Sequence, residues 1–147
     1  MPQSIREQIL QALMATLAPV ATAQGAPLLR SPVHGVPREA SPALLLFPES
    51  DTIVHRPNDR VERQLVVRLV ALARETRAGS PEALADQILV AAHAALFAHA
   101  NLGGLALGLR ELDCEWDVDD ADAGAAAIPA RYQITYRTLC YDLARQG

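Results

Sequence analysis

Residues 109–118 read LRELDCEWDV and residues 131–138 read RYQITYRT, so apolar and polar side chains alternate along both runs. Alternation with a period of two is typical of a strand that buries one face. A stretch rich in small residues joins the two runs. The sequence therefore predicts a β-hairpin in this region, with its turn near Gly124.

The two faces of the predicted hairpin differ in chemistry. The apolar face is expected to hold Leu112, Cys114, Trp116, Val118, Tyr132, Ile134 and Tyr136. Its aromatic side chains, Trp116, Tyr132 and Tyr136, are expected to be core residues, and a binding platform is the alternative. The polar face is expected to hold Glu111, Asp113, Glu115, Asp117, Asp119, Arg131, Gln133, Thr135 and Arg137. A turn near Gly124 would place Arg131 near Asp117 and Arg137 near Glu111, and such cross-strand pairs contribute about 0.2–1 kcal/mol each. Because the acids outnumber the arginines, this face is expected to be acidic.

The N-terminal half is expected to hold one helix and one short strand. Ser4-Ile5-Arg6-Glu7 is a capping-box pattern that starts a helix, which Pro19 is expected to stop. Seven of the ten prolines lie between Pro19 and Pro57. This stretch is therefore expected to be an irregular connection around one strand at residues 43–47, and residues 49–60 are expected to form a loop.

The middle of the chain is expected to form a strand and a second helix. Residues 61–74 are rich in β-branched side chains, which favours a strand over a helix. Ser80-Pro81-Glu82 supplies an N-cap, a proline at the first helical position and an acid in the first turn. The helix that begins there is expected to end at the glycines of residues 101–104.

These elements together predict an α+β fold. We expect one domain over residues 1–147, with two main helices packed on a mixed or mainly antiparallel sheet of about four strands. The order is α-β-β-α-β-β, and the tail at residues 139–147 is expected to be partly helical. At 147 residues the chain is long enough to bury a substantial core.

Composition narrows the class of protein. The net charge is −4, which argues against a nucleic-acid-binding surface over the whole molecule. Cys114 and Cys140 have neither C-x-x-C spacing nor a disulfide framework, so reduced thiols are expected. The N-terminus is too polar for a signal peptide, and no apolar run approaches the ~20 residues of a membrane helix. We therefore expect a soluble, unexported protein without membrane contact.

The acids between Asp113 and Asp122 are the densest group of reactive side chains. They follow one strand and its turn instead of converging from separate segments, so a solvated face or a subunit interface is favoured over a metal site. The four histidines lie in proline-rich loops or on different faces of one helix, which does not favour a zinc site. We predict no catalytic, cofactor-binding or metal-binding residue. A small metal-dependent hydrolase that uses these acids is the alternative from a different class.

The ordered set of elements resembles the tail terminator proteins, also called tail completion or minor tail proteins, of long-tailed bacteriophages and prophages. The resemblance covers roughly residues 4–138. The segments that carry it are IREQIL at 5–10, PALLLFP at 42–48, LGGL at 102–105, EWD with following acids at 115–117, and QITYRT at 133–138.

This resemblance implies a structural protein without catalysis. Members of the family form a ring, usually of six subunits, which caps the tail tube in the virion, stops tube polymerisation and meets the head connector. The implied partners are further copies of the chain, the tail tube protein and the connector protein, with assembly in the bacterial cytoplasm. Head-tail connector or neck proteins share a similar layout and are the closest alternative, and a cytoplasmic adaptor is a third.

Two features are candidates for contacts within such a ring. The loops at residues 25–41 and 49–60 would reach neighbouring subunits or the tube, because loops carry recognition. The acidic face of Glu111, Asp113, Glu115, Asp117 and Asp119, with Arg131 and Arg137 as cross-strand partners, would line either the lumen or an interface. In the lumen, its negative charge would repel DNA phosphate and let the genome pass without specific binding.

Overall fold

The computed structural model describes residues 2–32, 41–74, 80–116 and 125–147. The elements in chain order are α1 (Ile5–Ala23), β1 (Leu28–Arg30), β2 (Ala43–His55), β3 (Arg60–Arg74), α2 (Pro81–Ala98), the short 3-10 helix η1 (Leu102–Gly104), β4 (Gly108–Cys114), β5 (Ala125–Leu139) and β6 (Asp142–Gln146).

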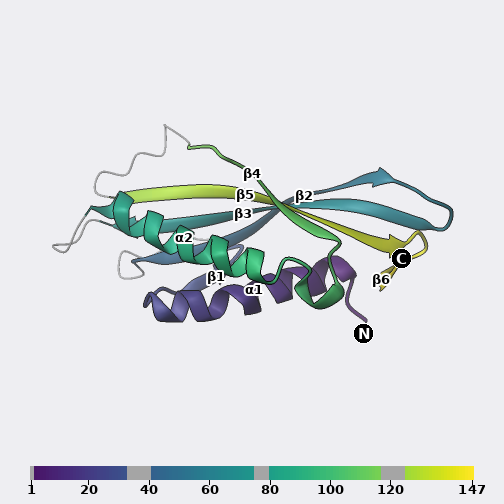
Figure 1. Ribbon diagram of the computed structural model, residues 1–147, viewed down its shortest axis with the longest axis horizontal. Helices are drawn as coiled ribbons and strands as arrows, with labels where there is room; N and C mark the ends of the chain where they lie inside the picture. The colour runs from purple at the N-terminus through teal and green to yellow at the C-terminus, as the bar shows by residue number, and fades with distance from the viewer. Residues whose placement is uncertain (1, 33–40, 75–79, 117–124) are drawn as a thin grey trace.

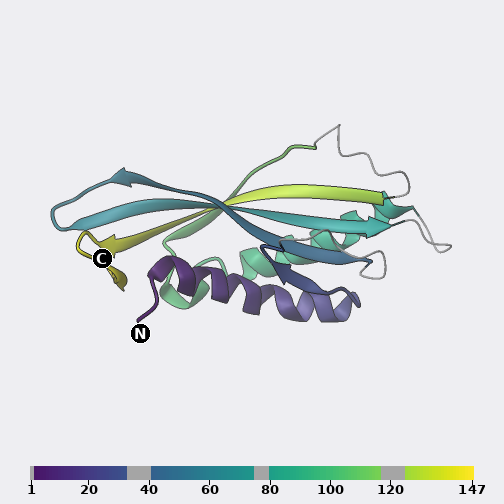
Figure 2. The same ribbon diagram turned by 180° about the vertical axis from the view of Figure 1, so that it is seen from behind.

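The strands form one twisted, mixed sheet in the order β1-β2-β3-β5-β4, and β6 pairs with the end of β5. β1 runs parallel to β2, and all other pairs are antiparallel. Both helices lie on one face of this sheet (Figure 1, and Figure 2 from behind). The α+β class with two main helices is therefore confirmed.

The sheet has six strands instead of about four. One added strand is β1, whose three residues pair with Leu44–Leu46 between the prolines of the connection. The other is β6, because the C-terminal tail is a strand and not partly helical. Both strands are short and have polar residues at their ends. The alternation of apolar and polar residues in each is therefore too weak to predict a strand from the sequence alone.

Helix α1 begins as expected but ends later. The Ser4 hydroxyl accepts a hydrogen bond from the Glu7 backbone N–H at 3.0 Å, as a capping box requires. Pro19 lies inside the helix, which continues to Ala23. Pro19 and Ala15 are both exposed, so water can satisfy the Ala15 carbonyl that loses its donor. Burial of Leu17 and Ala21 on the opposite side holds the last turn in place.

The expected loop at residues 49–60 is mostly strand. β2 and β3 pair from Ala43↔Leu72 to His55↔Glu62, with bulges at Glu49 and Val54. Figure 1 shows this hairpin running on beyond the end of the two helices; we call residues 50–64 the hairpin arm. Because the arm is solvated on much of its surface, its strands lack the apolar alternation that marks a buried face.

The core lies between the helices and one face of the sheet. It is built from apolar stripes at helical spacing on α1 and α2 and from alternate residues of β2, β3 and β5. The largest fully buried side chains are Tyr132, Tyr136, Ile9, Leu13, Leu17, Leu44, Leu46, Leu65, Leu69, Ile88, Ile134 and Val61.

Candidate functional site

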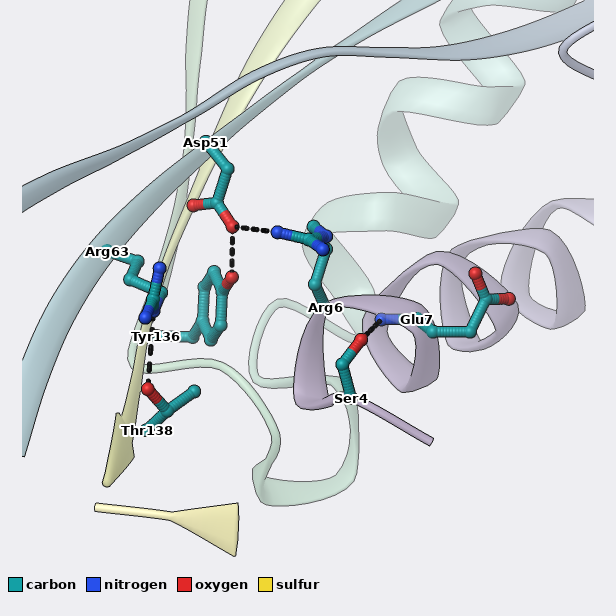
Figure 3. A network of polar contacts seen from close by, with 7 residues as sticks. All are labelled: Ser4, Arg6, Glu7, Asp51, Arg63, Tyr136 and Thr138. Atoms are coloured by element: carbon teal, nitrogen blue, oxygen red, sulfur yellow. Dashed lines mark hydrogen bonds and ion pairs between the residues drawn. The ribbon is translucent and has the colours of Figure 1, made fainter. Parts of the chain in front are cut away.

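A polar cluster joins the hairpin arm to the first turn of α1 (Figure 3). The Asp51 carboxylate on β2 accepts a hydrogen bond from Arg6 Nη1 at 3.1 Å and another from the hydroxyl of Tyr136 on β5. The Asp51 side chain is only 10% exposed. Burial, and next the hydrogen bond to Asp51, raise the pKa of Tyr136, so its hydroxyl stays protonated and donates. The cluster therefore fixes the arm relative to the helices.

A second ion pair ties α1 to the edge of the sheet. Arg30 on β1 donates from Nη1 and Nη2 to the two carboxylate oxygens of Glu7, at 2.5 and 2.6 Å. These bonds lower the pKa of Glu7. The bidentate geometry is the strong form of an arginine-carboxylate pair, and here it holds the three-residue strand β1 in place.

The face of the sheet without helices carries a charged seam, which we define as Glu49, Arg68, Asp113 and Arg131. Arg131 Nε donates to Glu49 at 3.0 Å, and its Nη1 donates to Asp113 at 2.9 Å. Arg68 Nε lies 3.8 Å from the other Glu49 oxygen, and its guanidinium stacks 5.0 Å from the centre of the Phe47 ring. The bulge at Glu49 supplies the extra residue that turns its carboxylate into the seam.

The predicted acidic face is not continuous, because β4 has a bulge at Leu112. Glu111 pairs with Tyr132 and therefore lies on the helix side of the sheet, whereas Asp113 pairs with Arg131 on the other side. The prediction that Glu111 and Asp113 share a face is wrong. One inserted residue reverses the side of every residue that follows it.

The predicted arginine partners also differ. Arg137 Nη2 contacts Glu62 of β3 at 3.1 Å, and not Glu111, because β4 begins opposite Thr135 and does not extend as far as Arg137. Arg131 contacts Asp113, whereas its predicted partner Asp117 lies outside the described residues. Both arginines therefore do form cross-strand ion pairs, but with other acids.

The remaining hairpin residues divide into three groups. Tyr132 and Tyr136 are core residues as predicted, each 1% exposed. Trp116 is 61% exposed, so its prediction as a core residue is wrong; with Glu115 it lies beyond the end of β4. Val118, Asp119, Asp120 and Asp122 lie outside the described residues.

Trp116 borders a groove of about 550 Å³ on the face of the sheet without helices. Leu45, Phe47 and Pro129 give the groove an apolar floor, and Arg68 and Glu115 place charges at its border. The groove meets the charged seam at Arg68, which belongs to both.

The histidines and cysteines occupy ordinary structural positions where the structure describes them. His93 Nδ1 lies 2.9 Å from the hydroxyl of Tyr132, and its ring packs on Phe97 at 4.7 Å. His55 ends β2 and His99 caps α2, whereas His34 lies outside the described residues. Burial, and then the charges of Glu111 and Asp113, raise the pKa of the Cys114 thiol, so thiolate chemistry is disfavoured there.

Metal ligands do not converge within the described ranges, since no group of three or more His, Cys, Asp or Glu side chains lies close enough to hold an ion. Neither α1 nor α2 has the length and hydropathy that crossing a membrane requires.

The arm residues Asp51 and Glu62 were missed as site residues by the sequence analysis. A signal was present, since Pro57-Asn58-Asp59 is a turn pattern between the β-rich stretches Thr52–Val54 and Val61–Val67.

Comparison of the sequence with models of known protein families gives no match, and comparison with curated proteins gives none either.

Proposed function

We propose that this chain is a tail terminator of a long-tailed phage or prophage. In this role it forms a ring on the end of the tail tube, stops tube polymerisation and offers a surface to the head connector. It acts by binding, without a cofactor, and the genome passes through the ring without specific recognition.

The hairpin arm is the observation that carries this proposal. It extends past the helices (Figure 2) and exposes Ile53 and Val54. Tyr141 and Leu143, near the β5–β6 turn, are also exposed. Exposed apolar side chains at a projecting end of the molecule favour a protein-protein contact. The Arg6-Asp51-Tyr136 cluster fixes the arm, which lowers the entropy lost on docking.

The free edge of β2 also supports an assembly role. β1 covers only Leu44–Leu46, so in the described part of the chain Glu49–His55 pair on one side alone, with β3. Unpaired backbone groups along an edge accept a strand from another chain. The arm therefore offers both apolar side chains and backbone hydrogen bonds to a neighbour or to the tube.

The test is electron microscopy of tubes assembled from a phage tail tube protein, with and without the purified full chain. We expect tubes of fixed length that bear a terminal ring. The Ile53→Asp/Val54→Asp variant should leave tubes uncapped, whereas Ala83→Asp, which adds a charge at an exposed position away from the arm, should cap them normally. Binding to the connector protein with unchanged, polydisperse tubes would instead favour a neck protein.

A further inference from the structure

At the end away from the hairpin arm, the sheet is apolar on both faces. Register places Leu45, Val70 and Pro129 side by side on β2, β3 and β5; we call these three residues the apolar row. Leu45 and Val70 adjoin the core residues Leu44 and Leu69 in sequence, so the apolar row lies on the face without helices. A sheet face that meets only water normally carries polar side chains. Burial under α1 and α2 therefore does not explain the apolar row.

The apolar row lines the groove of about 550 Å³ that Trp116 borders. Trp116 is the single tryptophan of the chain, and it is 61% exposed. Among aromatic side chains, indole attracts cations most strongly. In the same groove the guanidinium of Arg68 already stacks 5.0 Å from the centre of the Phe47 ring. The groove therefore holds one guanidinium against an aromatic ring and offers a second, exposed ring.

The groove also carries two acids without a cationic partner. Glu82 at the start of α2 and Glu115 just after β4 both line it, and both are exposed. Within the described ranges neither carboxylate forms a hydrogen bond or an ion pair. Arg68, which also lines the groove, lies beside Glu49 in the charged seam. An occupant with a positive charge is therefore complementary to the border of the groove.

We propose that the groove binds an arginine side chain of a partner protein, with apolar residues on either side of that arginine in the partner's chain. The apolar neighbours cover the apolar row, which removes its surface from water. The guanidinium lies against the exposed ring of Trp116, with Glu82 and Glu115 as its counter-ions. The apolar row supplies affinity, and the two carboxylates supply the preference for a cation.

Arginine fits this lining better than the other charged groups that a partner could offer. Its guanidinium is planar and more weakly hydrated than the ammonium of lysine, so it stacks on an aromatic ring at lower cost. Nucleic acid is disfavoured, because its phosphates would meet Glu82 and Glu115. The groove lies away from the hairpin arm, so this inference does not rest on the terminator function.

The fluorescence of Trp116 reports on the groove in the unmodified full chain. The probes are three blocked tripeptides, in which arginine, glutamine or glutamate stands between two valines. We expect the arginine peptide to change the emission and to bind at least about threefold more tightly than the glutamine peptide, with the glutamate peptide weakest. Molar salt should remove this preference. Equal affinity of the three peptides, a preference for glutamate, or unchanged emission with all three would overturn the proposal.

Glu82→Gln/Glu115→Gln tests the two carboxylates. We expect this variant to bind the arginine peptide about three- to tenfold more weakly and the glutamine peptide as before, because each exposed ion pair contributes modestly. The matched control is Asp86→Asn/Glu111→Gln, which removes two exposed acids from α2 and β4 that do not line the groove. The control should bind normally. An equal loss in both variants would show that net charge attracts the peptide, and would overturn the site.

Ala127→Arg tests the groove itself. Ala127 is exposed and lines the groove, so a long side chain at this position should occupy it and weaken binding of the arginine peptide several-fold. Ala18→Arg, at an exposed position on α1, adds the same charge elsewhere and should bind normally. Undiminished binding by Ala127→Arg would overturn the groove as the site. These measurements need no tail tube, so the groove and the terminator function are tested separately.

Discussion

The hydroxyl of Tyr136 on β5 donates a hydrogen bond to the carboxylate of Asp51 on β2, across the intervening strand β3. Both side chains lie on the helix side of the sheet, where Arg6 of α1 also contacts Asp51. This relationship connects three elements that are far apart in the sequence. It sets the direction of the hairpin arm on which the proposed function rests.

Tyr136→Phe should destabilise the fold, because it removes the hydroxyl and leaves a nearly buried carboxylate with Arg6 as its remaining partner. We expect a loss of about 1–3 kcal/mol in the free energy of unfolding, measured by urea denaturation. The matched control is Tyr141→Phe at an exposed tyrosine, which should change stability little. If both variants had the same free energy of unfolding, the hydrogen bond from Tyr136 to Asp51 would contribute nothing to stability.

The Glu7–Arg30 pair should make stability depend on pH. Arg30 lowers the pKa of Glu7 in the folded state below the ordinary value of 4.5. The pair therefore stabilises the fold fully above that value, and this contribution is lost as the pH falls through the folded-state pKa. Glu7→Gln should be less stable than the parent at neutral pH, and the difference should vanish in acid.

The same change in an Arg30→Met background is the control for that titration. Without the guanidinium, Glu7→Gln should show a much smaller pH dependence in urea denaturation at a series of pH values, because only Gln11 and Arg6 then lower the pKa of Glu7. If the difference in stability between Glu7→Gln and its parent persisted unchanged in acid, it would come from helix propensity and not from the ion pair with Arg30.

Pro19→Ala should stabilise the chain. Pro19 is exposed and lies inside α1, so alanine restores the missing backbone hydrogen bond with little loss of packing. Proline in a helix interior costs ~3 kcal/mol relative to alanine, and the gain here should be a fraction of that because α1 already accommodates it. A higher Tm by calorimetry is expected, and a lower Tm would mean that Pro19 contributes mainly by restricting the unfolded chain.

Arg131→Met should lower the Tm, because it leaves Glu49 and Asp113 without the guanidinium that lies between them. The loss should shrink in molar salt, which screens the repulsion between the two acids. Arg145→Met, at an exposed arginine near the C-terminus, is the matched control. The measurement is the Tm at low and molar salt, and a salt-independent loss would point to packing of the side chain instead.

The two thiols should differ in reactivity. Cys140 is exposed, whereas Cys114 is partly buried and has a raised pKa. At neutral pH a thiol reagent should label Cys140 quickly and Cys114 slowly, as followed by mass spectrometry. Cys140→Ser should leave only the slow phase, and fast labelling of that variant would contradict the described environment of Cys114.

Local chemistry predicted much of the fold. The caps at Ser4 and Ser80 act on backbone groups a few residues away, so they mark the helix starts wherever the helices pack. The alternation in residues 131–138 follows from one buried face of β5. The candidate site was predicted less well, because the partners of its acids and arginines depend on the register between strands.

The helix starts, the strand at residues 61–74, the core face of β5 and the α+β class could therefore be predicted from the sequence, because capping, β-branched content and burial periodicity are local. Three features could be established only from the folded chain: residues 49–60 are mostly strand, a bulge at Leu112 separates Glu111 from Asp113, and Arg137 pairs with Glu62 at a sequence distance of 75. Register between distant strands sets these features, and one inserted residue moves every side chain beyond it to the opposite face.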